Sequence, residues 1–247
     1  MKNEYYTIDP HVYDNQFWWK KDDIEFWKKI FIDKSQTILE LAAGTGRLGL
    51  PLAKENYDYS GIELSSSYCK YANNFFKTLG RNDSIKNQDM RFFNLRTSYD
   101  NIFIGFNSFL HLLTDKDVEN CLLSVKKHMH SKSNFYIDIL VPNPQFLYRP
   151  KNSALRVLEF EDNKKQKFYI DEILDYNKKL EIADITWIYS NSIKELFNFK
   201  FQMKMYYPDT MNRLLIDNGF KIKHIWGDYN KSKFNELSNL QIYDCCI

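Results

Sequence analysis

The chain has 247 residues, a hydrophobic share of 44% and a formal net charge of +2. This length suits one elaborated domain, or one domain with a subdomain, and the hydrophobic share is sufficient for a sizeable core. Nucleic-acid-binding surfaces usually carry clustered positive charge, whereas the lysines here are spread along the chain. The sequence has neither an apolar run that could span a bilayer nor a signal-peptide pattern, so we expect a cytoplasmic protein without a membrane partner.

The cysteines show no sign of a metal site or a disulfide framework. They are Cys69, Cys121, Cys245 and Cys246, and their spacing does not match a metal-binding pattern. Adjacent cysteines rarely bond to each other. We therefore expect reduced thiols in a cytoplasmic protein and no bound metal.

Aromatic residues are dense in residues 1–35, where we expect two helices. They are Tyr5, Tyr6, Tyr13, Phe17, Trp18, Trp19, Phe26 and Trp27. Such rings could simply pack in the core, or they could form a lid over a ligand. The sequence leaves both interpretations open.

Residues 37–48 form the most informative segment. An apolar run at 38–41 predicts a buried strand, and the small residues at 42–46 predict a turn. A helix is expected from Leu48, because Pro51 falls early enough to be tolerated in its first turn. A glycine turn between a strand and a helix lets a ligand approach the backbone, and the free N–H groups of the helix favour a partly anionic ligand.

A second strand is expected at residues 59–63, and it ends in Glu63. This carboxylate lies about twenty residues after the glycine turn, where nucleotide-binding βαβ folds place the acid that binds ribose. Glu63 alone could be a surface acid, but its position after the glycine turn favours the ribose role. The turn has neither the three-glycine dinucleotide spacing nor a phosphate-binding loop motif.

These two motifs, Glu-Leu-Ala-Ala-Gly-Thr-Gly-Arg at 40–47 and Gly-Ile-Glu-Leu-Ser at 61–65, resemble those of the class I S-adenosylmethionine-dependent methyltransferases. The likeness extends to an acidic loop after the third strand at 88–93, a fourth strand at 99–104, a fifth strand at 135–140, and N-terminal helices of the small-molecule branch at 12–14 and 23–26. The resemblance implies an α/β fold with a Rossmann-like, seven-stranded, mostly parallel sheet. It also implies S-adenosyl-L-methionine as the methyl donor and S-adenosyl-L-homocysteine as the product.

The resemblance also implies a set of cofactor-binding residues. Glu63 would bind the ribose, Asp89 would accept from the adenine amino group, and the Met90 N–H would reach the ring. Asp89 by itself is equally compatible with an ordinary loop acid. The other candidates are Tyr13, Glu40, Ala42, Gly44, Gly46, Arg47, Leu64 and Asn107.

His111 is the candidate catalytic residue. It follows the expected fourth strand, and ligands of doubly wound sheets bind outside the carboxyl ends of the strands. Because an imidazole titrates near neutrality, His111 could take a proton from an amine or hydroxyl acceptor. Alternatively it is a partly buried structural histidine. Thr114 and Asp117 then match a capping box that opens a helix.

Residues 154–206 change in character. Apolar and polar residues alternate at 197–205, which is typical of a half-buried strand, and polar turns separate the earlier apolar runs. We expect an antiparallel meander of about four strands that covers the carboxyl edge of the main sheet and walls the acceptor pocket. An edge extension or a dimer contact is the alternative. A helix at 208–218 and closing strands at 220–226 and 241–246 complete the chain.

The expected organisation has three parts. Residues 1–35 form a helical lid, residues 36–150 and 207–247 form the S-adenosylmethionine-binding core, and residues 151–206 form the inserted β subdomain. Rings of the lid would exclude water and attract the sulfonium, with Tyr13 as the best candidate by family resemblance.

The expected function is methyl transfer to a nitrogen or oxygen of a small-molecule acceptor by in-line displacement. We expect no nucleic-acid partner, and either a monomer or a homodimer. Two alternatives stay open: a methyltransferase that acts on RNA or protein, and a cofactor-binding module without catalysis.

Overall fold

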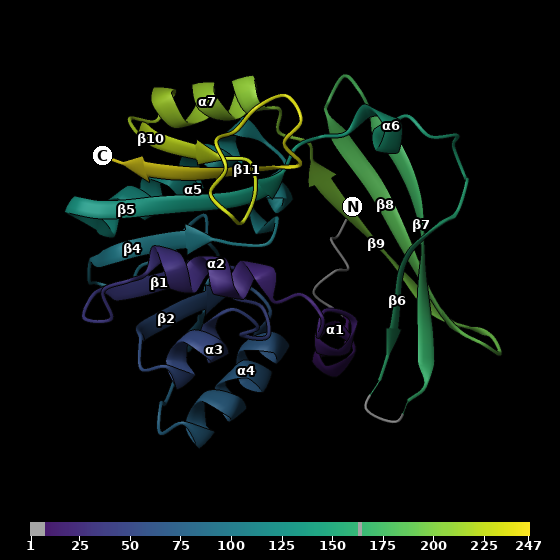
Figure 1. Cartoon of the computed structure of the whole chain (residues 1–247), viewed down its shortest axis with the longest axis horizontal. Coiled ribbons are helices and arrows are strands. Elements are labelled where there is room, and N and C mark those ends of the chain that lie inside the picture. The colour runs from purple at the N-terminus through teal and green to yellow at the C-terminus, as the bar shows by residue number, and fades with distance from the viewer. Residues whose placement is uncertain (1–7, 163–164) are drawn as a thin grey trace. The chain divides into compact units, whose positions relative to one another are not determined.

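Figure 1 shows the chain, of which the structure, a computed structural model, describes residues 8–162 and 165–247. The chain divides into two compact units. Unit 1 contains the chain up to Lys20 together with Pro142–Met205, and unit 2 contains Lys21–Val141 and Tyr206–Ile247. Tyr5 and Tyr6 of the aromatic-rich N-terminal segment lie outside the described residues.

Unit 2 is built on a seven-stranded sheet with the order β10-β11-β5-β4-β1-β2-β3. Its strands are β1 (Thr37–Leu41), β2 (Asp58–Glu63), β3 (Ile85–Asn87), β4 (Tyr99–Ile104), β5 (Met129–Leu140), β10 (Lys221–Trp226) and β11 (Leu240–Cys246). Neighbouring strands from β3 to β5 run parallel, and β11 is antiparallel to both β5 and β10. The predicted Rossmann-like, mostly parallel sheet is confirmed.

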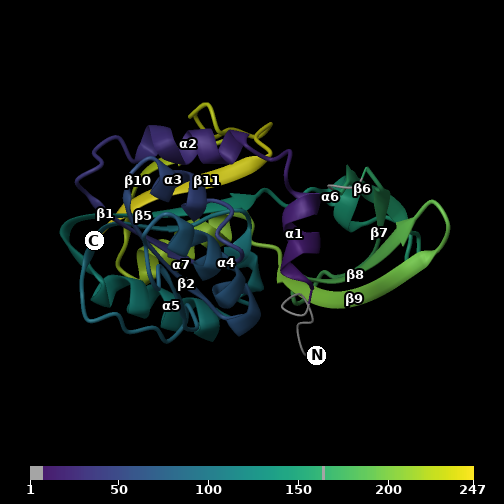
Figure 2. The ribbon, with the colours of Figure 1, turned by 90° about the horizontal axis from the view of Figure 1, so that it is seen from below.

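Helices cover both faces of this sheet: α2 and α5 lie on opposite sides of it (Figures 1 and 2). The helical elements of unit 2 are α2 (Asp22–Ile30), α3 (Gly49–Lys54), α4 (Ser66–Thr78), the 3-10 helix η2 (Ser108–His111), α5 (Asp115–Lys127) and α7 (Pro208–Asp217). Pro51 falls in the first turn of α3, as expected. The residues Gly80 and Gly219, which follow α4 and α7, adopt positive φ values of 73° and 80°, so glycine can end both helices without a Cβ clash.

The core of unit 2 contains the aromatic residues of α2. Trp27 is fully buried. Its ring centroid lies 4.6 Å from that of Phe103 on β4 and 5.6 Å from that of Phe31. Phe26, also buried, packs edge-on against Trp226 of β10. Phe26 and Trp27 therefore pack in the core, which was one of the two interpretations of the aromatic-rich segment. Trp18 and Trp19, by contrast, are 60% and 49% exposed.

Unit 1 contains a four-stranded antiparallel sheet with the order β6-β7-β8-β9. Its elements are α1 (Pro10–Gln16), α6 (Pro144–Leu147), β6 (Leu155–Glu161), β7 (Lys167–Asn177), β8 (Ile182–Asn191) and β9 (Glu195–Lys204). The Tyr189 hydroxyl donates to the side-chain oxygen of Gln16, and both residues are fully buried. This bond ties α1 to the sheet. The predicted meander is confirmed, and its placement over the active site stays a prediction.

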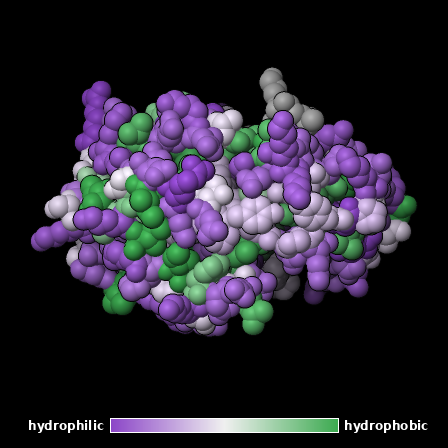
Figure 3. All heavy atoms as spheres, turned by 90° about the horizontal axis from the view of Figure 1, so that it is seen from above, coloured by the Kyte–Doolittle hydropathy of each residue, from purple (hydrophilic) through white to green (hydrophobic). Residues whose placement is uncertain are grey.

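The face of the molecule drawn in Figure 3 is mainly polar. On the face shown in Figure 3 hydrophilic residues predominate, and hydrophobic side chains gather in separate patches. Among the described residues, no helix has the length and apolar character needed to cross a membrane.

The capping box at the start of α5 gives a stability prediction. The Thr114 hydroxyl oxygen accepts from the Asp117 N–H at 3.1 Å, and the hydroxyl donates to the Asp117 carboxylate at 2.7 Å. Thr114→Ala should lower the free energy of unfolding by about 1 kcal/mol, because the helix loses its N-cap. Thr114→Ser keeps the hydroxyl and should retain most of the stability in urea denaturation. Equal losses in both variants would contradict the cap.

Candidate functional site

The glycine turn after β1 has the strained backbone that small residues permit. Ala42, Gly44 and Gly46 have φ values of 57°, 57° and 82°. The Ala43 N–H donates to the Ile62 carbonyl at 2.9 Å, which fixes the turn against β2. A Cβ on Gly46 would lie 3.2 Å from the Phe76 ring, whereas a Cβ on Gly44 would meet no atom within 4 Å. Gly46 therefore packs against the protein, and Gly44 faces open space that a ligand can use.

Glu63 is fixed by the same turn. Its Oε2 accepts from the Gly44 N–H at 2.9 Å, and its Oε1 accepts from the Ser65 N–H at 2.7 Å. The side chain is only 4% exposed. Burial raises the pKa of this carboxyl, while the two backbone N–H groups act in the opposite direction. Each oxygen keeps a further acceptor position, so the geometry fits a pair of ribose hydroxyls.

Arg47 belongs to a buried ion pair that the sequence did not reveal. Its Nη2 lies 2.6 Å from Asp23 Oδ2 and its Nη1 lies 3.1 Å from Asp23 Oδ1. Asp23 is fully buried at the start of α2. The guanidinium also lies 4.3 Å from the Phe106 ring centroid. Two hydrogen bonds to Asp23 and the contact with the Phe106 ring hold the Arg47 side chain in place. They link the turn after β1, which contains Arg47, to the turn after β4, which contains Phe106.

Glu40 is a buried acid on β1. Its Oε2 accepts from the Tyr59 hydroxyl at 2.6 Å, and the residue is 3% exposed. Burial raises the pKa of Glu40 to about 8, although the Tyr59 bond and the charge of Arg47 lower it. Burial is the larger effect because a carboxylate loses its hydration there. Burial therefore favours the protonated form of Glu40.

Asp89 follows β3, as predicted, and it binds Arg91. Arg91 Nη2 lies 2.6 Å from Asp89 Oδ2, and Arg91 Nη1 lies 2.7 Å from Asp117 Oδ1. Partial burial raises the pKa of Asp89, but its hydrogen bonds to the Arg91 side chain and N–H outweigh that effect and lower the pKa overall. A carboxylate held by arginine can still accept from an amino group, so the adenine role of Asp89 stays a prediction. The neighbouring Met90 is half-buried in the turn after Asp89.

A second group of residues lies after β4 and near the end of β5. Asn107 adopts a φ of 66°, and its side-chain oxygen accepts from the Leu140 N–H at 2.7 Å. Asp138, on β5 and 1% exposed, accepts from the Phe106 N–H at 3.2 Å and from the Tyr229 hydroxyl at 2.9 Å. Asn107 therefore joins two strand ends, and any contact of this residue with a cofactor stays a prediction.

The remaining candidates occupy different environments. His111 is half-buried at the end of η2, on the segment that follows β4. Leu64 is 44% exposed directly after Glu63. Tyr13 belongs to α1 in unit 1, where its ring lies 5.1 Å from that of Phe17. The predicted lid segment thus contributes α1 to unit 1 and α2 to unit 2. Its role over the cofactor stays a prediction.

Both the sequence of the core and the fold are similar to those of known proteins. A family model described as a methyltransferase domain matches residues 38–132, which include the glycine turn, Glu63 and Asp89. The fold is similar to that of an S-adenosylmethionine-dependent methyltransferase from Clostridium acetobutylicum ATCC 824, with a TM-score of 0.78 over 96% of each chain at 17% identity. Residues 38–132 therefore match a methyltransferase domain, and the whole chain has the fold of a class I methyltransferase.

Two further solved structures share the methyltransferase fold. The CcbJ methyltransferase from Streptomyces caelestis has a TM-score of 0.77 and 17% identity, with 98% of this chain and 97% of that chain covered. The sugar N-methyltransferase KedS8 from Streptoalloteichus sp ATCC 53650 has a TM-score of 0.66 and 13% identity, with 90% and 86% covered. No curated protein matches the sequence. At these identities the likeness concerns the fold.

Three residues of the candidate site were not predicted from the sequence. They are Asp23, Tyr59 and Tyr229, the partners of Arg47, Glu40 and Asp138. Each lies on a different element from its partner, and no spacing along the chain links them. No cluster of three or more His, Cys, Asp and Glu side chains suited to a metal ion occurs in residues 8–162 and 165–247.

Glu63 gives the first prediction for this site. Glu63→Ala should weaken S-adenosylmethionine binding by about 1.5–3 kcal/mol, because charged hydrogen-bond acceptors are lost. Calorimetric titration measures the change. Glu236→Ala removes an exposed acid from the same unit and should leave the affinity unchanged. Equal affinity in the Glu63→Ala variant would exclude Glu63 from the cofactor site.

Glu40 gives a pH-dependent prediction. Its pKa is raised from 4.5 to about 8 in the folded chain, so its contribution to stability is fully present below pH 4.5 and is lost as the pH rises to about 8. The wild type should therefore lose stability relative to Glu40→Gln across this window. Melting temperatures measured against pH test this.

Tyr59→Phe provides the matched control for Glu40. This variant removes the hydroxyl that favours the ionised carboxylate, so the loss of stability should extend to higher pH than in the wild type. Parallel pH profiles for the wild type and Glu40→Gln would contradict a raised pKa at Glu40.

Proposed function

We propose that the chain transfers the methyl group of S-adenosylmethionine to a nitrogen or oxygen of a small-molecule acceptor by in-line displacement. The observation that carries the proposal is the arrangement of Glu63 and Gly44. A buried carboxylate held by two backbone N–H groups stands beside a glycine with open space at its Cβ position. This arrangement suits a nucleoside with two free ribose hydroxyls.

Different residues of unit 2 would bind different parts of the cofactor. Glu63 would accept from the ribose hydroxyls, and the loop of Asp89 and Met90 would hold the adenine. Bound S-adenosylmethionine supplies a methyl group activated by its sulfonium. Arg47, which Asp23 fixes in the glycine turn, would donate to an anionic group of the ligand through its guanidinium.

The acceptor has to lose a proton only if it is an amine or a hydroxyl. His111, on the segment after β4, would take that proton, whereas a carboxylate acceptor needs no base. Because the sulfonium already provides an activated leaving group, the protein has mainly to align the acceptor with the methyl group and to exclude water. The lid role of the N-terminal segment, including Tyr13, belongs to this proposal.

The small-molecule acceptor is supported by two observations. The net charge of +2 is low, and the lysines are scattered, whereas an RNA substrate favours clustered positive charge. In addition, one structurally similar protein is a sugar N-methyltransferase. The cytoplasmic location stays a prediction.

One experiment tests the proposal as a whole. Calorimetric titration with S-adenosylmethionine and S-adenosylhomocysteine comes first, followed by a screen of amines, carboxylic acids and phenols with a radiolabelled methyl donor. Micromolar binding and label in a small molecule are expected. Label only in RNA or protein would reject the small-molecule acceptor. No binding to the folded protein would contradict the donor assignment.

His111 gives the catalytic prediction. His111→Ala should lower turnover on an amine or hydroxyl acceptor by roughly 10²–10⁴-fold, because a general base is lost, while cofactor affinity stays unchanged. His224→Ala removes an exposed histidine of β10 and should retain full turnover. Full turnover in the His111→Ala variant would show that His111 has a structural role and is not the general base.

A further inference from the structure

Unit 2 has a surface pocket that the methyl-transfer site does not use. Its volume is about 500 Å³, and it lies between the loop that joins β3 to β4 and the C-terminal end of α5. The lining residues that matter here are Phe92, Arg96, Thr97, Ser98, Lys127 and His128. All of them belong to unit 2, so the pocket is complete within one compact body.

The pocket lies at the opposite edge of the sheet from the cofactor site. Ser98 directly precedes β4 and His128 directly precedes β5, and these two strands run parallel. The pocket is therefore at the amino ends of the strands. Glu63 and Gly44 belong to the carboxyl ends of β2 and β1 in the same parallel set. A ligand in this pocket would leave the cofactor site free.

The lining carries two cations and no carboxylate. Arg96 and Lys127 are exposed, and neither forms an ion pair with any residue that the structure describes. The hydroxyls of Thr97 and Ser98 add two hydrogen-bond donors. Two acids on these elements, Asp89 and Asp117, are both bound by Arg91, and a third, Glu119, is bound by Lys116. This set of groups suits an oxyanion, because two cations can share its charge and hydroxyls can donate to its oxygens.

The floor of the pocket is rigid and neutral. The Leu95 N–H donates to His128 Nε2 at 2.9 Å, so this nitrogen is unprotonated. His128 Nδ1 then carries the proton and donates to the Ser124 carbonyl at 2.7 Å. The neutral imidazole stacks on Phe93 with ring centroids 4.3 Å apart. A floor with this hydrogen bonding does not compete with Arg96 and Lys127 for an anion.

Arg96 lies in a turn with a left-handed backbone. Its φ is 55°. Its N–H donates to the Asn94 side chain at 3.2 Å, which helps to hold the turn. Phe92, which lines the same pocket, is 65% exposed, and the Arg91 guanidinium lies 5.6 Å from its ring centroid.

We propose that this pocket is a second ligand site, for a small organic phosphate. The phosphate contacts Arg96, Lys127 and the two hydroxyls, and the apolar part of the ligand packs on Phe92. The volume of about 500 Å³ falls within the usual range for small-molecule sites. The proposal rests on unit 2 alone and does not depend on the proposed methyl transfer.

The test uses the full chain with saturating S-adenosylhomocysteine present. Inorganic phosphate and phenyl phosphate are titrated separately and followed by calorimetry or by amide chemical shifts. Saturable binding of both is expected, with phenyl phosphate tighter because it also contacts Phe92. The double variant R96Q/K127Q should lose about tenfold or more in affinity for both probes. Phe92→Ala should weaken phenyl phosphate only.

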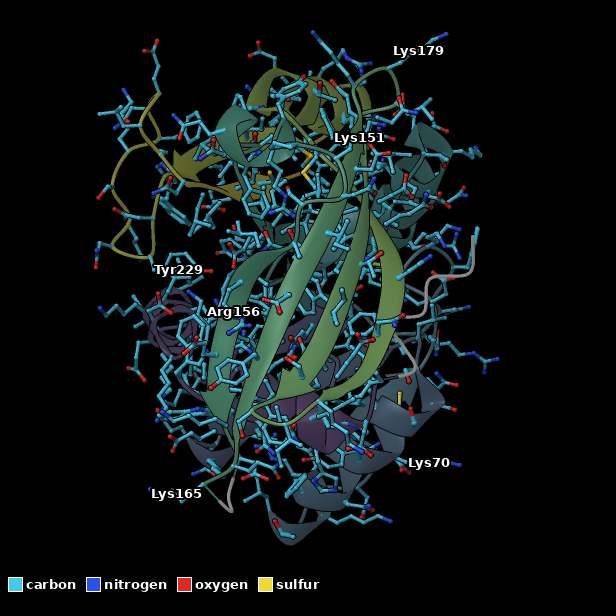
Figure 4. All side chains as sticks on the ribbon, turned by 90° about the vertical axis from the view of Figure 1, so that its right-hand side faces the viewer. Lys70, Lys151, Arg156, Lys165, Lys179 and Tyr229 are labelled. Carbon is cyan, nitrogen blue, oxygen red and sulfur yellow. The ribbon has the colours of Figure 1, made fainter. Side chains whose placement is uncertain are left out.

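The matched control is Lys70→Gln. Lys70 is an exposed cation of α4 in the same unit and lies outside the pocket lining (Figure 4). This variant should bind both probes as the wild type does. Equal losses for Lys70→Gln and the double variant would show nonspecific attraction and overturn the proposal. Undiminished binding in the folded double variant, or probe binding only when S-adenosylhomocysteine is omitted, would also overturn it.

Discussion

The carboxylate of Glu63 is the interaction on which the site depends. It accepts from the N–H of Gly44, in the turn after β1, and from the N–H of Ser65, which caps α4. One side chain therefore joins the ends of two parallel strands and the start of a helix. Because it is buried, losing either donor would leave a charged oxygen without compensation, so the turn and the acid keep each other in place. The hydrogen bond to Glu63 fixes the backbone of Gly44, and a Cβ at Gly44 would meet no atom within 4 Å.

Other buried polar side chains at the carboxyl edge of the sheet also have local partners. Asp23 neutralises Arg47 through two short bonds, Tyr59 donates to Glu40, and Tyr229 donates to Asp138. Each pair joins elements that are distant in sequence, such as α2 with the turn after β1. A site for a charged ligand needs polar groups away from water, and such groups persist only where partners satisfy them. The packing of α2 around Trp27 supports the first of these pairs.

The carboxyl edge of the sheet and the pocket at the amino ends of β4 and β5 differ in the way their charges are arranged. At the carboxyl edge, acids and cations are paired or hydrogen-bonded before any ligand arrives, as in Asp23 with Arg47. At the amino ends of β4 and β5, Arg96 and Lys127 have no ion-pair partner among the described residues, and the neutral His128 lies between hydrogen-bond partners. The first arrangement gives a preorganised site for a ligand with several polar groups. The second leaves an excess of positive charge that an anion can neutralise.

The sequence by itself determined the glycine turn, the capping box at Thr114 and the four-stranded meander, because each depends on local periodicity or on residues a few positions apart. The resemblance of its motifs to those of the class I methyltransferases indicated the fold class. The sequence also placed Glu63 at the end of a strand. Only the tertiary structure decided that Phe26 and Trp27 enter the core while Trp18 stays exposed, and that Asp23 holds Arg47. These contacts depend on how separate elements pack, and burial and pairing across elements leave no periodic trace in the chain. The same reason explains why the pocket between Arg96 and Lys127, thirty-one positions apart, could not be predicted.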